Sequence, residues 1–96
     1  MRLILSDAWP AGKRTEADVA KAQRGIQSIE VGGALLKALA ADAHALTLGE
    51  LARRAGMSAA KAHPYAVSFG KLGLFEQDPL SGRYALGPFA LELGLA

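Results

Sequence analysis

Apolar residues recur at helical spacing in the stretch that follows residue 26. Four of them fall on one side of a helix with 3.6 residues per turn: Ile29, Leu35, Leu36 and Leu39. This stripe predicts a helix from about Ser28 to Asp42, with the Ser28 side chain as its N-terminal cap. The pair Gly32-Gly33 lies inside it and costs roughly 1 kcal/mol per glycine relative to alanine. We expect another backbone to pack closely against these glycines.

Two further helices follow, joined by a short turn. Thr47-Leu48-Gly49-Glu50 has the pattern of a capping box, in which the Thr side chain and the Glu three residues later bond each other's free backbone N–H groups. This helix continues to Ala55 and ends at Gly56, because glycine readily adopts the left-handed conformation of a sharp stop. Ser58 then caps a third helix, predicted over residues 59–72 and ended by Gly73.

The pattern changes from helical to extended after Gly73. Residues 74–77 and 83–86 alternate between apolar and polar, and the Asp-Pro-Leu-Ser-Gly sequence at 78–82 is typical of a turn, so this segment predicts a β-hairpin. Pro88 then begins a final helix, which we expect to be amphipathic. The order of elements predicts a mainly α fold with a small β-hairpin wing, that is, a winged helix-turn-helix with a three-helix core, a two-stranded wing and a C-terminal linker helix.

The chain divides into three parts on this basis. Residues 1–25 form an arm that is flexible or marginally helical, with a turn at 8–12 and good helix formers at 14–24 that offer only a weak apolar stripe. Residues 26–87 form the winged helix-turn-helix domain, and residues 88–96 begin the linker helix.

Composition narrows the class of protein. A chain of 96 residues holds one small core, and its 51% of hydrophobic residues is typical of a soluble globular domain. Its apolar runs are too short for a membrane span or a signal peptide. The absence of cysteine excludes disulfides and Cys-ligated zinc, and we expect a cytoplasmic protein that does not associate with membranes.

Charge adds little to this picture. The formal net charge is +2, and between residues 47 and 86 basic residues exceed acidic ones by five to three. This balance is compatible with contacts to phosphate but would not suggest them unaided.

The motifs along these elements resemble those of a known family. They are Gln27-Ser28-Ile29-Glu30, the run from Thr47 to Ser58, Lys61-Ala62-His63, the run from Gly73 to Asp78, the run from Ser81 to Gly87, and Leu91-Glu92-Leu93-Gly94. With these motifs, the chain from Ile26 to Ala96 resembles the N-terminal domain of the IclR family of bacterial transcriptional regulators. The Tyr84-to-Gly87 run before the last helix is the most specific part, and the resemblance covers about three quarters of the chain.

The resemblance implies a homodimer that binds double-stranded DNA, with helix 59–72 in the major groove and the wing, residues 74–86, on the backbone. Residues 14–24 and the last helix are then the expected contacts between two copies. The resemblance also implies a second, effector-binding domain joined through the last helix. No such domain follows in this sequence, so we expect the effector site to lie outside this chain. Three explanations stay open for a chain that stops inside the linker helix: a fragment of a longer protein, an engineered chain or the remnant of a gene.

Helix 59–72 has an apolar side and a side that is free to enter a groove. Ala62, Tyr65, Ala66, Phe69 and Leu72 are predicted to face the core. The other side offers few of the Arg, Lys, Asn and Gln side chains that read base edges best. The candidate DNA-binding residues are Thr47, Ser58, Ala60, Lys61, His63, Pro64, Ser68, Lys71 and Arg83.

Pro64 interrupts this helix, because proline lacks the N–H that would bond the carbonyl of Ala60. Two interpretations stay open: a kinked helix that starts after Ser58, or a helix that begins only at Pro64. Many members of the family carry an arginine here, so the resemblance implies that one DNA contact is missing. We therefore expect weak binding of low specificity.

Other functions fit the sequence less well. A winged-helix module that binds proteins rather than DNA is the alternative, favoured by the modest charge and by Pro64. An enzyme is not expected, because no nucleophile-and-base pair, phosphate-cradling Gly loop or paired carboxylates occur. His44 and His63 are too few and too far apart for a metal site, and no cofactor is expected.

Overall fold

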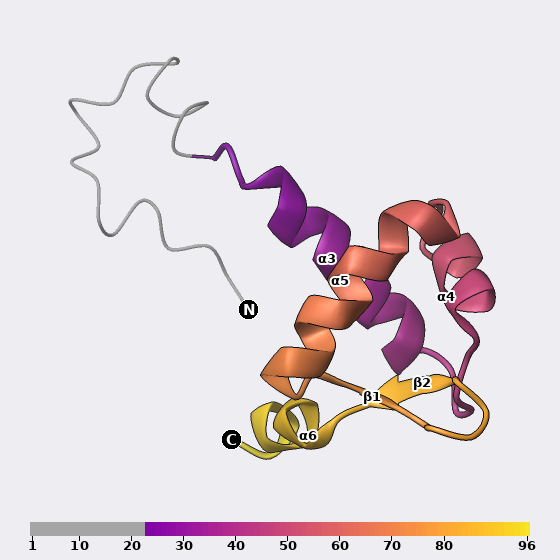
Figure 1. Ribbon diagram of the computed structural model, residues 1–96. Helices are drawn as coiled ribbons and strands as arrows, with labels where there is room; N and C mark the ends of the chain where they lie inside the picture. Colours follow the sequence, from indigo (N-terminus) through magenta and orange to yellow (C-terminus); the bar gives the residue numbers. More distant parts are fainter. Residues whose placement is uncertain (1–22) are drawn as a thin grey trace, which may run out of the picture.

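The computed structural model describes residues 23–96 of the chain (Figure 1). The elements, in order, are α3 (Gln27–Ala40), α4 (Leu48–Arg54), α5 (Ala59–Leu72), β1 (Phe75–Gln77), β2 (Tyr84–Leu86) and α6 (Pro88–Leu95). This order confirms the predicted winged helix-turn-helix. The arm expected over residues 1–25 lies, up to position 22, outside the described residues, as does the turn expected at 8–12.

The two helices of the helix-turn-helix begin at the capping residues and end at the glycines that the sequence predicts. The Thr47 hydroxyl accepts a hydrogen bond from the Glu50 backbone N–H, and the Glu50 carboxylate accepts one from Thr47, which completes the capping box. The Ser58 hydroxyl accepts from the Lys61 backbone N–H at 3.1 Å. Gly56 and Gly73 both adopt the left-handed conformation, with φ of 77° and 80°.

The start of α3 differs from the prediction. Its cap is Ile26, whose carbonyl accepts hydrogen bonds from the N–H groups of Ile29 and Glu30, so Ser28 lies inside the first turn and does not cap the helix. The helix also ends earlier, at Ala40. Asp42 is engaged elsewhere: its carboxylate accepts from the His44 backbone N–H at 2.8 Å and pairs with Arg54.

Helix α5 runs through Pro64. It begins at Ala59 and continues to Leu72 with the proline in its sixth position. The interpretation in which the helix starts only at Pro64 is therefore wrong. The proline ring is exposed, on the side of α5 that faces away from the core.

The core lies where the three helices and the wing meet. Its buried residues are Leu35, Leu39, Leu46, Leu51, Ala52, Ala62, Ala66, Phe75 and Tyr84. Three of them are alanines of α4 and α5, whose small side chains allow the two helices to approach closely. Leu72, which was predicted to face the core, is instead 61% exposed, and Ile29 of the apolar stripe is 70% exposed. Ile29 lies in the first turn of α3 and Leu72 is the last residue of α5. The first turns of α3 extend beyond α4 and the wing (Figure 1).

The glycine pair in α3 has a different neighbour from the one expected. A Cβ on Gly32 would lie 2.8 Å from the Cζ atom of Phe69, so an aromatic side chain, not a backbone, packs on this glycine. A Cβ on Gly33 would meet no atom of the described residues within 4 Å.

The wing is an antiparallel pair of strands with one further attachment. Gln77 lies opposite Tyr84 and Phe75 opposite Leu86. Leu46, just before α4, forms a single β-bridge with Tyr84 through hydrogen bonds of 2.9 and 2.7 Å. The sequence did not predict this bridge. It ties the wing to the entrance of the helix-turn-helix.

Helix α6 follows the wing at a point of close backbone contact. The Gly87 N–H donates to the Leu74 carbonyl, and the Phe89 N–H donates to the Gly73 carbonyl. The expected amphipathic pattern is wrong, because apolar side chains surround the helix and Glu92 is its one charged residue. No residue of α6 is buried against the rest of the described chain, and within residues 23–96 no helix is long and apolar enough to cross a membrane.

The two glycines of α3 offer a matched test of this packing. We expect Gly33→Ala to raise the free energy of unfolding by up to about 1 kcal/mol, because alanine favours the helix and the new methyl group enters open space. We expect the free energy of unfolding of Gly32→Ala to be about 1–3 kcal/mol lower than that of Gly33→Ala, because the new methyl group at position 32 displaces the Phe69 ring. Urea unfolding of both variants measures the difference, and equal gains would show that Phe69 does not confine position 32.

Candidate nucleic-acid interface

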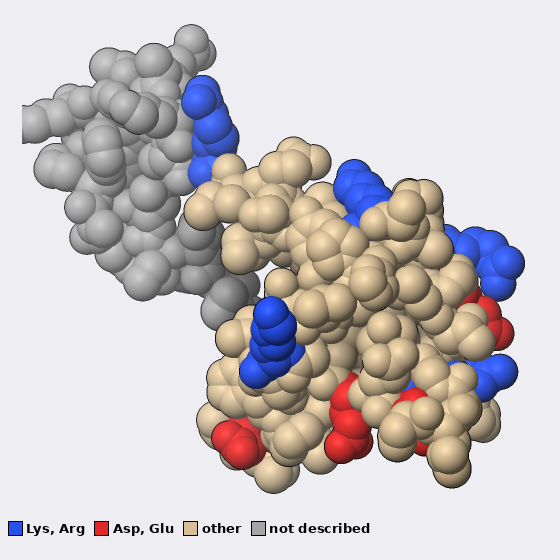
Figure 2. Space-filling view, in the orientation of Figure 1, with Lys and Arg blue, Asp and Glu red and all other residues tan. Residues whose placement is uncertain are grey.

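The fold leaves the outer face of α5 uncovered. Ala60, Pro64, Val67 and Lys71 share this face, and all are exposed. The opposite face carries Ala62 and Ala66, which pack in the core and hold the helix in place. Among these four residues, only Lys71 has a side chain that can donate a hydrogen bond. Figure 2 shows that the Lys and Arg side chains on the visible face of the molecule stand apart, separated by uncharged surface or by acidic side chains.

The N-terminus of α5 suits an anion. The Ser58 hydroxyl occupies one of the free N–H groups of the first turn, that of Lys61. The first turn contains no acidic residue, so nothing on it offsets the positive end of the helix dipole. The Lys61 side chain is exposed there, and a phosphate oxygen would find both a cation and free backbone N–H groups.

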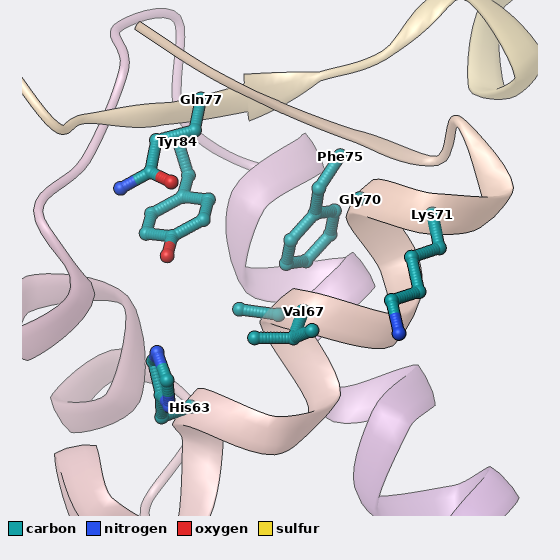
Figure 3. Close-up of a pocket in the computed structure, with 8 residues that line it drawn as sticks. His63, Val67, Gly70, Lys71, Phe75, Gln77 and Tyr84 are labelled. Atoms are coloured by element: carbon teal, nitrogen blue, oxygen red, sulfur yellow. The ribbon is translucent and has the colours of Figure 1, made fainter. Parts of the chain in front are cut away.

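A cleft separates α5 from the wing (Figure 3). This wing cleft has a volume of about 400 Å³ and is lined by His63, Ala66, Val67, Gly70, Lys71, Phe75, Gln77 and Tyr84. Figure 3 shows the His63 ring and the Tyr84 hydroxyl directed into one end of the cleft, with the Gln77 amide nearby and Lys71 on the far side. The cleft therefore presents the hydrogen-bonding groups of His63, Gln77 and Tyr84 at one end and the Lys71 amine at the other.

Arg83 is engaged within the protein. Its guanidinium donates to the Glu50 carboxylate at 3.1 Å and to the Ala45 carbonyl at 3.4 Å, while 45% of its side chain stays exposed. The interaction joins the second wing strand to the capping box of α4. Arg83 would reach a phosphate only by sharing its guanidinium with Glu50 or leaving it.

Three carboxyl groups of the described chain are held in the ionised form. The hydrogen bond from the Thr47 backbone N–H is the main reason why the pKa of Glu50 lies below its usual value, and Arg83 adds to it. The backbone N–H of His44 lowers the pKa of Asp42 in the same way, with help from Arg54. The backbone N–H of Leu80 lowers the pKa of Asp78 in the wing turn.

The predicted site residues fall into three places. One set lies along α5 and its start, facing outward or toward the wing: Ser58, Ala60, Lys61, His63, Pro64 and Lys71. Thr47 and Arg83 lie together at the start of α4, joined through Glu50. Ser68 is separate, because it lines a groove on the other flank of α5, beside α3.

Sequence reasoning missed the wing side of the cleft. Gln77 and Tyr84 are cross-strand partners, so a hairpin register would have placed them together on one face. Gln77 was assigned only to the strand pattern, and its amide also donates to the Gly82 carbonyl at 3.1 Å. Within residues 23–96 no group of three or more potential ligands gathers to hold a metal ion.

The chain is similar to proteins of one family. Residues 28–79 match the family model of the IclR helix-turn-helix domain. The glycerol operon regulatory protein of Streptomyces griseus is 41% identical over 71 residues, which cover 74% of this chain and 28% of that protein. The protein of the same name from Streptomyces coelicolor is 39% identical over 71 residues, again 74% of this chain and 28% of the relative.

Solved structures agree with the sequence comparison. Pseudomonas aeruginosa HmgR superposes with a TM-score of 0.70 at 41% identity, over 73% of this chain and 29% of that one. An IclR transcriptional regulator from Alicyclobacillus acidocaldarius superposes with a TM-score of 0.67 at 26% identity, over 75% of this chain and 29% of that one. The chain thus spans less than a third of the length of the relatives it matches.

The lowered pKa of Glu50 predicts a pH-dependent contribution to stability. Because the folded state binds this proton less tightly than the unfolded state, the contribution is present above the usual carboxyl pKa and is lost as the pH falls through the folded value. Gln keeps the capping-box acceptor but not the charge. We expect Glu50→Gln to be slightly less stable than the parent at pH 7, because the charge that the Thr47 N–H and Arg83 stabilise is lost. Urea unfolding at pH 7 and pH 3 should show this gap closing on acidification. A constant gap would contradict the assignment.

Proposed function

This chain belongs to the family of the IclR helix-turn-helix domain, and we propose that it binds double-stranded DNA as part of a transcriptional regulator. The observation that carries the proposal is the exposed outer face of α5, framed on one side by the wing cleft. An α-helix of this kind fits the major groove, and the adjacent hairpin then lies along the sugar–phosphate backbone.

In this arrangement the start of α5 binds the backbone and its outer face meets the bases. Lys61 and the free N–H groups after Ser58 hold one phosphate. Ala60, Pro64 and Val67 press against the base edges, where they read shape and thymine methyl groups rather than hydrogen-bonding patterns. His63 and Lys71 reach the groove from the side of the wing cleft.

Phosphate contacts supply most of the affinity in this proposal. Lys61, Lys71 and Arg83 are the cations near the interface, and Arg83 is shared with Glu50. The outer face of α5 carries no Arg, Asn or Gln, the side chains that with Lys distinguish one base pair from another. Binding is therefore of low sequence specificity.

We further propose that the protein acts as a cytoplasmic homodimer and not as an enzyme. Helix α6 is the contact between copies, since Phe89, Leu91, Leu93 and Leu95 expose from 40% to 88% of their surface on it. Apolar surface of this extent on a single short helix favours a partner. The effector-binding site belongs to the part of the relatives' length that this chain does not span.

Lysine variants test the phosphate contacts. We expect Lys61→Ala to weaken binding about equally for all duplex sequences and to lower the slope of log affinity against log salt by about 1, because one phosphate contact is lost. Fluorescence anisotropy with labelled duplexes at several salt concentrations measures both effects. Lys37→Ala, which removes the same charge from α3, is the matched control and should leave the slope unchanged. Binding of the parent that does not depend on salt would refute a DNA interface and favour a protein-binding module.

Substitutions of Pro64 test why we expect DNA binding of low sequence specificity. Pro64→Arg restores a backbone N–H inside α5 and places a guanidinium on the outer face, where a paired contact to guanine is worth about 1–3 kcal/mol. We expect tighter and more selective binding to an operator-length duplex pool, by roughly 10-fold or more. Pro64→Ala restores the N–H alone and should not gain selectivity. Equally tight binding by the parent and by Pro64→Arg would refute this account.

A further inference from the structure

The wing cleft contains a buried hydroxyl group that has no partner in the described chain. Tyr84 is only 6% exposed, and its hydroxyl forms no hydrogen bond with any group of residues 23–96. Figure 3 shows this hydroxyl directed into the cleft, on the side of the His63 ring. Buried hydroxyl groups in native proteins nearly always have a hydrogen-bond partner, because an unpaired one is costly. The partner of Tyr84 therefore comes from what enters the cleft, either water or a ligand.

The position of this hydroxyl is fixed by the surrounding structure. The Tyr84 backbone N–H donates to the Leu46 carbonyl at 2.7 Å, and the Leu46 N–H donates to the Tyr84 carbonyl at 2.9 Å. The Tyr84 ring lies against Phe75, with 6.1 Å between the ring centroids. Because both the backbone and the ring are held, the hydroxyl is already in place before a ligand arrives. A group ordered in advance loses little conformational entropy on binding.

The lining of the cleft suits an anion. None of its lining residues is acidic. The His63 ring lies at the same end as the Tyr84 hydroxyl, and the Lys71 amine lies at the other end (Figure 3). The Gln77 amide already donates to the Gly82 carbonyl at 3.1 Å, so its part is to hold the wing. The phenol, the imidazole and the amine all donate hydrogen bonds of the kind that phosphate oxygens accept.

The cleft opens at the edge of the outer face of α5. Val67 and Lys71 belong both to that face and to the lining of the cleft. An α-helix with its side chains is about 10–12 Å across, and the major groove is about 12 Å wide. A helix that lies in the groove therefore has one DNA strand along each flank. On the flank that carries the wing, this strand passes over the mouth of the cleft.

We propose that the Tyr84 hydroxyl and the His63 ring together bind one phosphate of the DNA strand that runs between α5 and the wing. This assignment rests on the proposed function and adds a buried, uncharged contact to it. A phosphate oxygen replaces water at the hydroxyl without the loss of a hydrogen bond, and an ionised acceptor makes the bond stronger. Lys71 lies two helical turns from His63, about 12 Å along the axis, so it meets a different phosphate of the same strand.

The two tyrosines of the chain offer a matched test. Tyr84→Phe removes the hydroxyl and keeps the ring that lies against Phe75. We expect its affinity for duplex DNA to fall roughly 10-fold, about equally for all sequences, because one hydrogen bond to an ionised oxygen is lost. The slope of log affinity against log salt should stay at the parent value, because no charge is removed. Tyr65→Phe removes a hydroxyl from the groove on the other flank of α5 and should bind as the parent does.

A double-mutant cycle tests whether the two residues hold the same phosphate. Fluorescence anisotropy gives the affinities of His63→Ala, Tyr84→Phe and the double variant for one duplex. We expect the double variant to lose less affinity than the product of the two single losses, because either change alone disrupts the shared contact. Losses that multiply would show that His63 and Tyr84 act at separate places, which would overturn the shared site.

Stability serves as the control for folding. We expect Tyr84→Phe to unfold in urea no more easily than the parent, because the hydroxyl has no partner in the described chain to lose. Circular dichroism checks that its helices are intact. A loss of DNA affinity in a variant of unchanged stability then belongs to the interface and not to the fold.

The remaining outcomes separate this assignment from the proposed function. Parent binding that does not depend on salt would refute the DNA interface and this assignment with it. Salt-dependent binding by the parent, with equal affinity for Tyr84→Phe, would overturn the assignment alone. Inorganic phosphate, titrated against chloride at equal ionic strength, tests the other source of a phosphate group. Shifts of the residue 77 and 84 amide resonances in the parent alone, without an effect of Tyr84→Phe on DNA affinity, would assign the cleft to a small phosphorylated ligand instead.

Discussion

The contact between the backbones of Gly73 and Gly87 is the constraint on which the geometry of the domain depends. A Cβ at position 87 would collide with the Gly73 carbonyl, and Gly73 itself requires a left-handed backbone, so both positions need glycine. Close to this contact α5 and β2 end, and β1 and α6 begin. The angle between the proposed DNA-reading helix and the wing is therefore set by main-chain contacts, independently of the side chains on either surface.

The residues that pack α5 into the domain and the residues that it exposes lie on opposite faces of the helix. The inner face packs through Ala62 and Ala66, whose small size fixes the distance to the neighbouring helices. The outer face contributes nothing to the core, so most substitutions there change the stability of the domain little. Pro64 is an exception in energy but not in fold, since it removes one hydrogen bond of the helix and the helix nevertheless continues through it.

Most of the local structure was predictable from the sequence, although the Ser28 cap was not correct, and the tertiary contacts were not predictable. The capping box at Thr47, the Ser58 cap and the left-handed Gly56 and Gly73 depend on neighbouring residues only, and all were predicted. The exposure of Ile29 and Leu72 depends on how far α3 extends past α5, which periodicity does not show. The one-residue bridge of Leu46 has no periodic signal at all, and the pairing of Arg83 with Glu50 joins residues 33 positions apart. Of the candidate interface, the positions along α5 could be predicted from helical geometry, whereas the wing side of the cleft required the strand register.

The turn of the wing has a consequence for how such a domain can diversify. Asp78 accepts from the Leu80 N–H and the Ser81 hydroxyl, and its own carbonyl accepts from the Gly82 N–H, so the turn is folded by its own hydrogen bonds. Leu80 at its tip is almost fully exposed. Insertions and deletions at this tip would leave the core untouched, so the length of the wing is an evolutionary variable that related proteins can change independently of helix sequence.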